Sequence, residues 1–350
     1  NKPINRFPFF QTLHSFCFTQ MGLDKARVMQ PKNYQELGND LDIEIEGGYN
    51  QDQDHDGTLR YDNPYLQLIH KARALMLEPL EYYDRYEPDD TEIKRNKLDI
   101  IFEGLNIYKD EKGMVDFDDM LERYVNGYFD KETNRKIEFI PPEFKVVFLD
   151  EAQDCSGMQW KLFNKIEERS EYSVVTGDDD QGIYKWNGAD VDTFINLKGR
   201  RRVLKKSHRV PKEPFKVADR IIKKVINRVD KEYYPKKENG SVKYCQSLYE
   251  IDFTDGEWLV LASANYMLND IGDVLDEKEL YWQRRNATPR VKNIYEIIQN
   301  WNKLRTGIPM HYNDCKKIFH KMNKNWDKKL FKSMTKDKFY DIDTLKNNYG

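Results

Sequence analysis

The chain has 350 residues, of which 39% are hydrophobic and 33% charged, and its formal net charge is −3 at pH 7. This length allows two domains with a sizeable core, and the lack of any apolar run of about 18 residues excludes a membrane-spanning helix. The four cysteines are far apart and form no Cys-x-x-Cys pair. This argues against a disulfide framework or a zinc site and favours a reducing, cytoplasmic setting.

Charges are segregated along the chain despite the near-neutral total. Residues 35–122 are rich in acids, whereas residues 198–209 and 301–346 are rich in lysine and arginine. Local basic stripes of this kind suit a protein that binds nucleic acid on one face. A solvated surface explains each run equally well when it is taken singly, so the charge pattern alone identifies no partner.

Amphipathic helices are predicted in the first third of the chain. Apolar residues recur at helical spacing in residues 64–86 and 90–108. In residues 7–21, His14 and Ser15 could donate to phosphates at a helix N-terminus, and a capped amphipathic helix that buries Phe16 and Phe18 is the alternative. Asp116 is the predicted N-cap of a further helix, whose first-turn acids would lie at the positive end of the helix dipole. The role of that helix is expected to be structural.

One acidic segment imitates a calcium-binding loop. Residues 52–57 place acids at positions one, three and five and a glycine at position six, as the first half of an EF-hand does. Asn63 stands where such a loop needs a bidentate glutamate. We therefore expect a solvated loop here rather than a metal site.

The centre of the chain predicts a strand–helix–strand unit. Residues 146–149 form a short apolar run typical of a buried parallel strand, residues 157–169 have helical spacing, and residues 173–176 form a second strand. Asp150 and Glu151 end the first strand, and further carboxylates end the second. Because ligands bind outside the carboxyl ends of strands in such sheets, these acids predict a metal–nucleotide site.

Phosphoryl transfer needs charge neutralisation and a positioned water, and these residue types can supply both. Asp150 is the predicted Mg²⁺ carboxylate, since Mg²⁺ takes only one or two protein carboxylates. Glu151 is the predicted general base, and the Gln181 amide can reach both the γ-phosphate and the water. A single acidic pair at a strand end is as readily a solvated cap, but two such strand ends in order disfavour that alternative.

Two aromatic residues follow Gln181 closely. Tyr184 and Trp186 would share one face, opposite Ile183, if the segment alternates as a strand does. Stacking of a base on an aromatic ring contributes about 1–3 kcal/mol and tolerates any base. The alternative is that both rings belong to the core.

The second half of the chain predicts a second α/β region. We expect strands at residues 202–204 and 258–262, helices at 213–229 and 291–304, the latter packed on the sheet, and a basic, largely helical stretch at 311–350.

Two motifs carry a resemblance to a known family. Asp150-Glu151-Ala152-Gln153-Asp154 resembles the Walker B motif of UvrD/Rep-type superfamily 1 DNA helicases, and the run Gly177 to Trp186 resembles their motif III. The resemblance implies an α/β fold of two RecA-like P-loop NTPase motor domains, parallel sheets flanked by helices, with α-helical insertions. The implied divisions are a first motor domain at 1–20 and 114–200, a helical insertion at 21–113, a second motor domain at 201–305 and the start of a second insertion at 306–350.

The resemblance also implies roles for residues outside the central unit. Arg209 matches the arginine finger of motif IV that reaches the γ-phosphate, and His208 replaces the usual tyrosine that stacks on the adenine. On the DNA side, His14 and Ser15 match motif Ib, and Tyr184 and Trp186 match the rings that contact single-stranded DNA. Relatives usually have arginine after this tryptophan, where the present chain has Asn187.

The activity implied is ATP- and Mg²⁺-dependent movement, 3′ to 5′, along single-stranded DNA with unwinding of duplex DNA. The chain contains no G-x-x-x-x-G-K-[ST] and no counterpart of the family's motifs V and VI. We therefore expect an internal fragment, truncated at both ends of the motor and without ATPase activity by itself. A helicase subunit of a helicase–nuclease and a catalytically dead DNA-binding scaffold are the alternatives, and the intact Asp-Glu pair argues against the scaffold.

Overall fold

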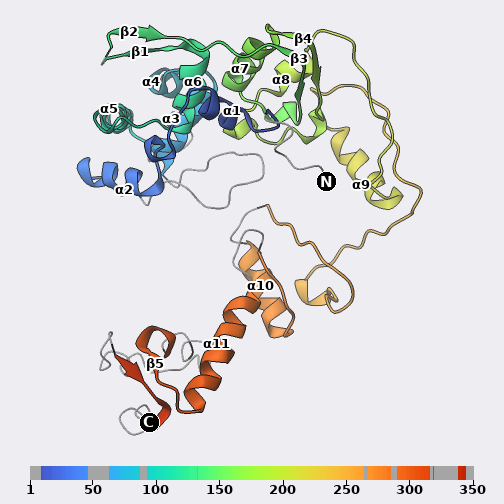
Figure 1. The fold of residues 1–350 in the computed structure, drawn as a ribbon. Helices are drawn as coiled ribbons and strands as arrows, with labels where there is room; N and C mark the ends of the chain where they lie inside the picture. The colour runs from blue at the N-terminus through green and yellow to red at the C-terminus, as the bar shows by residue number, and fades with distance from the viewer. Residues whose placement is uncertain are drawn as a thin grey trace. The chain divides into compact units, whose positions relative to one another are not determined.

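The computed structural model describes residues 9–45, 63–86, 93–131, 133–263, 267–284, 290–315, 318 and 338–343 (Figure 1). The chain forms two compact units, Asn1–Val242 and Lys243–Gly350. The calcium-like segment at 52–57 and most of the basic stretch at 311–350 lie outside the described residues.

The first unit contains most of the helices that the structure describes. Those described are α1 (Leu13–Gln20), α2 (Pro31–Asp40), α3 (Pro64–Ala74), α4 (Pro79–Tyr86), α5 (Arg95–Lys112), α6 (Phe117–Asn126), α7 (Gly157–Glu167), α8 (Val191–Ile195) and α9 (Lys212–Ile222).

The single helix predicted at 64–86 is wrong, because two helices occupy this stretch. α3 ends at Ala74, Met76 adopts a left-handed φ of 60°, and α4 begins at Pro79. Proline has no N–H to donate to a preceding turn, and its ring suits the first position of a new helix. The next helix, α5, begins and ends later than predicted and is closed by Gly113 in the left-handed conformation.

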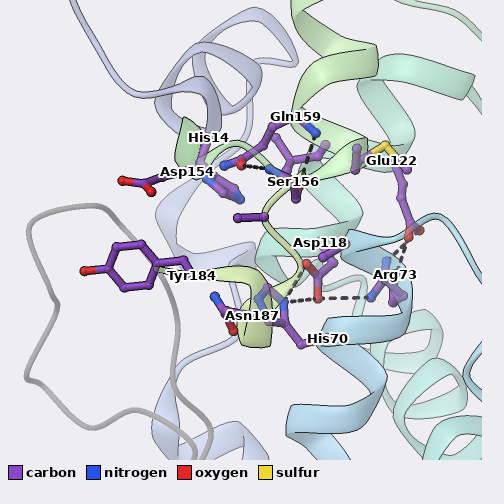
Figure 2. Close-up of a pocket in the computed structure, with 14 residues that line it drawn as sticks. His14, His70, Arg73, Asp118, Glu122, Asp154, Ser156, Gln159, Tyr184 and Asn187 are labelled. Atoms are coloured by element: carbon purple, nitrogen blue, oxygen red, sulfur yellow. Dashed lines mark hydrogen bonds and ion pairs between the residues drawn. The ribbon is translucent and has the colours of Figure 1, made fainter. Parts of the chain in front are cut away.

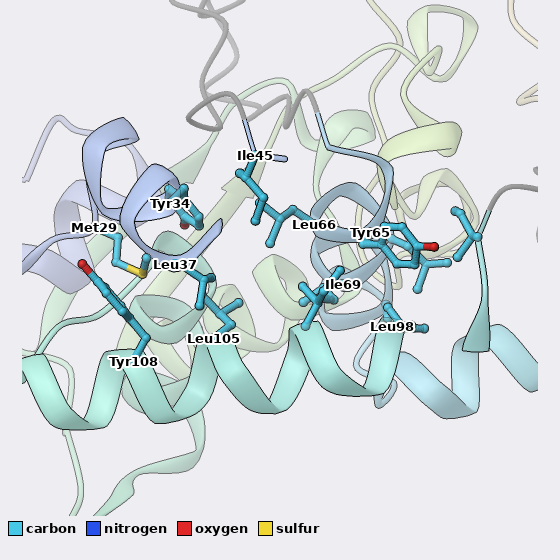
Figure 3. Close-up of a cluster of buried hydrophobic side chains, with 14 of the residues drawn as sticks. Met29, Tyr34, Leu37, Ile45, Tyr65, Leu66, Ile69, Leu98, Leu105 and Tyr108 are labelled. Carbon is cyan, nitrogen blue, oxygen red and sulfur yellow. The ribbon is translucent and has the colours of Figure 1, made fainter. Parts of the chain in front are cut away.

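A helical core packs along one face of α5 (Figure 3). Leu98, Ile101 and Leu105 share one face of α5 and are at most 2% exposed. They pack in a cluster with residues from α2, α3 and α4, which extends along the chain from Met29 to Met114. Complete burial of one such side chain contributes about 1.5–3 kcal/mol.

α6 begins at the predicted N-cap. Asp116 accepts a hydrogen bond from the Asp119 amide at 2.7 Å, and the Asp119 carboxylate accepts one from the Asp116 amide at 2.9 Å. This reciprocal capping box satisfies two amides that the helix itself leaves unpaired. α6 then packs with α1 and α7 in a second core, separate from that of α5.

The predicted strand–helix–strand unit is confirmed. β3 (Phe144–Leu149) pairs in parallel with β4 (Ser170–Val175), and α7 connects them. The expectation that β3 is a buried strand is wrong, because Leu149 is buried but Phe148 is 72% exposed. In the described part of the chain, helix packing covers one face of this two-stranded sheet. A second sheet, the antiparallel pair β1 (Tyr128–Asp130) and β2 (Arg135–Ile137), was not predicted.

The strands predicted at 202–204 and 258–262 are wrong. Neither segment belongs to a ladder among the described residues, and Leu204, Leu259 and Leu261 are about four-fifths exposed. A strand needs a neighbour for its backbone N–H and C=O groups, and neither apolar run has one there. The helix predicted at 213–229 is also shorter than expected, since α9 ends at Ile222.

The second unit contains α10 (Met267–Glu277), α11 (Arg290–Arg305) and the antiparallel pair β5 (Met310–His311) and β6 (Phe339–Tyr340). The helix predicted at 291–304 is confirmed as α11. Leu304 is fully buried in a small core with Met310 and Tyr340, from β5 and β6. The expected partner of this helix, a sheet strand at 258–262, is not formed.

Candidate nucleotide site and adjoining pocket

The carboxyl ends of β3 and β4 are joined by hydrogen bonds. The Thr176 amide donates to the Leu149 carbonyl at 2.8 Å, and the Ala152 amide donates to the Thr176 carbonyl at 3.0 Å. The Thr176 hydroxyl also donates to Asp150 Oδ1 at 2.5 Å. The acids that follow both strands therefore lie at one edge of the sheet, as the sequence predicts.

Glu151 is held in an unusual backbone conformation beside this edge. Its φ and ψ of 51° and 41° are left-handed, which is uncommon for a residue other than glycine and is frequent at functional sites. The side-chain Nε2 of Gln153 donates to Glu151 Oε2 at 2.9 Å. The carboxylate is exposed and remains open to a ligand.

Gln153 is the residue that sequence reasoning missed. It is 1% exposed, and while its Nε2 holds Glu151, its Oε1 accepts a hydrogen bond from the Asp178 amide at 2.9 Å. A Cβ on Gly177 would lie 2.5 Å from this Oε1, so any larger residue would displace the Gln153 side chain. The sequence does place this amide side chain two residues after Glu151. Only the structure shows that it is buried and joins the two strand ends.

Gln181 lies in the turn after β4. Its Nε2 donates to Asp178 Oδ2 at 2.7 Å, and its side chain is exposed. Burial works to raise the pKa of Asp178, but hydrogen bonds from Gln181 and Lys231 lower it below its usual value. Glu151, Gln153, Asp178 and Gln181 thus form a continuous hydrogen-bonded series.

Asp150 is suited to a metal ion that also binds other ligands. Both bonds it accepts fall on Oδ1, and Oδ2 has no donor in the described part of the chain. The described residues contain no cluster of three or more His, Cys, Asp or Glu side chains able to hold a metal. One exposed carboxylate fits Mg²⁺, which retains waters and binds phosphate oxygens.

Arg209 and His208 lie in an exposed segment before α9. The buried Ser207 accepts bonds from the Arg209 and Val210 amides at 3.2 and 2.9 Å. Across the described ranges, no hydrogen bond or ion pair joins the Arg209 guanidinium to Glu151 or Gln181. The expected convergence of these three residues therefore stays a prediction.

A pocket beside the strand edge brings together two of the predicted DNA-contacting residues (Figure 2). His14 of α1 and Tyr184 line it together with residues of α3, α6 and the turn before α7. Ser15 lies outside this lining, and its hydroxyl donates to Gln11. Trp186 is 39% exposed, which disfavours the core alternative for this ring.

The predicted strand-like alternation after Gln181 is wrong. Lys185–Asn187 forms a short 3₁₀ turn instead, and this turn brings the rings of Tyr184 and Trp186 to a centroid separation of 6.2 Å. Ile183 is exposed, and Asn187, which stands where relatives have arginine, is buried.

A buried charge network adjoins the pocket, which its members His70, Arg73, Asp118 and Glu122 line, and it was also missed. Arg73 of α3 pairs with Asp116 at 3.0 Å, Asp119 at 2.7 Å and Glu122 at 2.7 Å, while His70 Nδ1 lies 2.8 Å from Asp118. Bidentate, hydrogen-bonded pairs of this kind are the form in which buried charges are tolerated. The sequence feature that could have revealed this network is Arg73, an arginine on the apolar face of the helix predicted from residue 64.

The two histidines of the pocket have opposite shifts. Burial lowers the pKa of His14 to about 4, so its imidazole is neutral at pH 7. Burial acts in the same direction on His70, but the Asp118 carboxylate overcomes it and raises the pKa of His70.

Residues 6–201 match the family described as the UvrD/REP helicase N-terminal domain. The chain belongs to this family. The matched segment of this UvrD/REP member contains both strand ends and the pocket, and it ends before Arg209.

Three relatives of this family member illustrate the similarity. It is 26% identical over 297 residues to the ATP-dependent DNA helicase PcrA of Bacillus subtilis (strain 168), covering 81% of the chain and 38% of the relative. It is 26% identical over 146 residues to the ATP-dependent DNA helicase Rep of Buchnera aphidicola subsp. Baizongia pistaciae (strain Bp), covering 40% and 22%. It is 20% identical over 289 residues to PcrA of Staphylococcus aureus (strain Mu50 / ATCC 700699), covering 81% and 38%. The chain thus spans well under half the length of these curated relatives.

The described residues of this UvrD/REP family member include no helix that is both long and apolar enough to cross a membrane.

Proposed function

We propose that the chain is part of an ATP-dependent DNA helicase that moves 3′ to 5′ along single-stranded DNA and unwinds duplex DNA. The observation that carries the proposal is the pair of parallel strand ends, at which Gln153 joins the Glu151 carboxylate to the segment that carries Gln181. Family membership and the names of the relatives support the same activity.

The strand-end residues would act on the terminal phosphate of ATP. Asp150 would hold Mg²⁺, which when bound neutralises charge on the phosphates. Glu151 would accept the proton of the attacking water, because it is exposed and its carboxylate is oriented by Gln153. Gln181 would contact the γ-phosphate through its exposed amide.

Residues of the following segment would complete the nucleotide site. Arg209 would act as the arginine finger on the γ-phosphate, and His208 would stack on the adenine. Both side chains are exposed, and the buried Ser207 fixes the backbone that presents them. A movement of the Arg209 side chain would then bring its guanidinium to the strand edge.

DNA would bind next to the nucleotide site. Tyr184 and Trp186 would stack on bases, since they lie in ring contact a few residues past Gln181. His14 would contact the strand as a neutral donor, because burial keeps its pKa near 4. Ser15, exposed on α1, would donate to a phosphate.

The domain divisions form part of the proposal. We place a first RecA-like motor domain at 1–20 and 114–200, a helical insertion at 21–113, the second motor domain at 201–305 and a second insertion from 306. The separate buried core that extends from Met29 to Met114 supports the first insertion.

The proposal is tested by replacing the general base in the full-length protein that carries this chain. Glu151→Gln removes the proton acceptor but keeps the size and the bond to Gln153. We expect DNA-stimulated ATP hydrolysis to fall by about 10²–10⁴-fold, the usual contribution of a general base, with ATP binding retained. Steady-state ATPase assays and nucleotide-binding titrations measure the two quantities.

Glu171→Gln is the matched control, because Glu171 is an exposed carboxylate near the opposite end of β4. It should leave the rate unchanged. Equal rates in the wild type and both variants would contradict the catalytic role of Glu151. Complete lack of hydrolysis in a wild-type protein that still binds DNA would support the scaffold alternative.

A further inference from the structure

Three consecutive carboxylates follow β4 and face one another across a single turn. Asp178, Asp179 and Asp180 precede Gln181, and the side chain of Asp179 is only 4% exposed. Like charges this close repel strongly when they are removed from water. The turn therefore depends on cationic partners.

The partners come from a segment about fifty residues later in the chain, between α9 and Tyr234. Arg228 makes a bidentate pair with Asp180 at 2.8 and 2.7 Å. Lys231 Nζ lies 2.5 Å from both Asp178 and Asp179 and 3.2 Å from Asp180. The Val229 amide adds a bond of 2.7 Å to Asp179.

These contacts are mostly shielded from solvent. The side chains of Arg228 and Lys231 are 17% and 13% exposed. Burial works to lower the pKa of Lys231, but the surrounding carboxylates raise it overall, so the amine is charged at neutral pH. Partly buried, multiply bonded pairs are much less screened than surface pairs.

The same segment also binds the backbone that carries Arg209. The Tyr234 amide donates to the Lys205 carbonyl at 2.7 Å, and the Ser207 amide donates to the Tyr234 carbonyl at 2.8 Å. Ser207 in turn accepts the bond from the Arg209 amide. On its other side, Lys231 shares Asp178 with the side chain of Gln181.

We propose that residues 228–234 form a positioning bridge that fixes Gln181 and Arg209 relative to each other. The inference rests on the proposed function for its catalytic consequence. Arg228 and Lys231 act through other residues, because their charged groups are already paired with Asp178, Asp179 and Asp180. Loss of the bridge would let the two γ-phosphate contacts move independently.

The test uses Lys231→Met in the full-length protein, with Lys224→Met as the control. Lys224 is an exposed lysine of the same region with no ion pair in the described structure. We expect backbone hydrogen exchange to rise by about tenfold or more in both 178–182 and 205–209 for Lys231→Met. The control should match the wild type.

A kinetic measurement separates positioning from a merely structural role. For Lys231→Met we expect kcat for ATP hydrolysis to fall by about 10²-fold while KM for ATP changes little, because misplaced groups lose transition-state contacts. Lys231→Arg keeps the charge and should recover most of the rate. If Lys231→Met does not fold, Arg228→Gln removes only the Asp180 pair and should shift both readouts in the same direction.

Faster exchange at 178–182 without any change at 205–209 would overturn the bridge. Coupled exchange with an unchanged kcat would overturn its catalytic role. A wild-type protein without ATPase activity would instead contradict the proposed function, and the exchange result would still decide whether the bridge exists.

Discussion

His14 and His70 line one pocket, yet their surroundings shift the pKa of each imidazole in opposite directions. His14 packs edge-on against the Phe117 ring at 5.7 Å and is neutral, whereas His70 is paired with Asp118. A neutral imidazole can donate one hydrogen bond to a DNA strand without attracting its charge. The imidazole of His70, by contrast, is already paired with the Asp118 carboxylate at 2.8 Å.

These shifts predict two separate histidine titrations. Between pH 6.5 and 4 the unfolded state binds more protons at His14 than the folded state, so this residue lowers stability as pH falls through that range. His70 has a raised folded pKa, so its stabilisation is present below about pH 6.5 and is lost as pH rises through the folded value.

NMR titration of the imidazole protons measures both values, with His14→Gln used to assign the first signal. We expect a midpoint near 4 for His14 and a midpoint above 6.5 for His70. Asp118→Asn should bring the His70 midpoint down. A His14 midpoint near 6.5 would contradict its burial.

Single residues differ in how far the sequence predicts them. Asp150, Glu151 and Gln181 follow from residue type and position after a strand, because ligand chemistry is local to the strand end. Gln153 and Arg73 could not be predicted in the same way. Their bonds join residues that are distant in the chain, and such contacts depend on the assembled fold.

At the scale of elements, the strand–helix–strand unit follows from periodicity because its two strands pair with each other. The failed strands at 202–204 and 258–262 show the limit of that reasoning. An apolar run of the right length becomes a strand only when a neighbour supplies hydrogen bonds, and no periodicity within the run reveals whether one exists. The break between α3 and α4, by contrast, could have been predicted from Pro79, because the residue before a proline disfavours helical backbone angles.

The packing between the ends of β3 and β4 can be tested with a substitution at Gly177. Gly177→Ala would place a Cβ 2.5 Å from Gln153 Oε1 and 3.0 Å from the Phe194 ring. We expect the bond between Gln153 and the Asp178 amide to break and the free energy of unfolding to fall by about 1–3 kcal/mol, the usual cost of overpacking.

Urea denaturation measures the change, with Gly157→Ala as the control. Gly157 lies at the start of α7, where a Cβ would approach only the flexible end of Met76 and a carbonyl, at 3.3 and 3.4 Å. This control should remain within about 1 kcal/mol of the wild type. Equal, small effects of both variants would show that the junction is not tightly packed.

At the scale of the whole molecule, the chain is a UvrD/REP family member. Its first unit holds the acids at the ends of β3 and β4, the pocket lined by His14 and Tyr184, and the segment 228–234. We propose that Asp150, Glu151, Gln181 and Arg209 meet at one triphosphate. Gln153 and the bridge at 228–234 explain how Glu151, Gln181 and the backbone of Arg209 are held. The proposal further requires the Arg209 side chain to move toward the γ-phosphate when ATP binds.

The most direct measurement is a structure of the full-length protein with Mg²⁺ and a non-hydrolysable ATP analogue. We predict Asp150 on the metal side of the triphosphate, and Gln181 and Arg209 both within hydrogen-bond distance of the γ-phosphate. Glu151 should lie within reach of the attacking water. Binding of the analogue away from the ends of β3 and β4, or with Glu151, Gln181 and Arg209 facing separate spaces, would contradict the proposed nucleotide site.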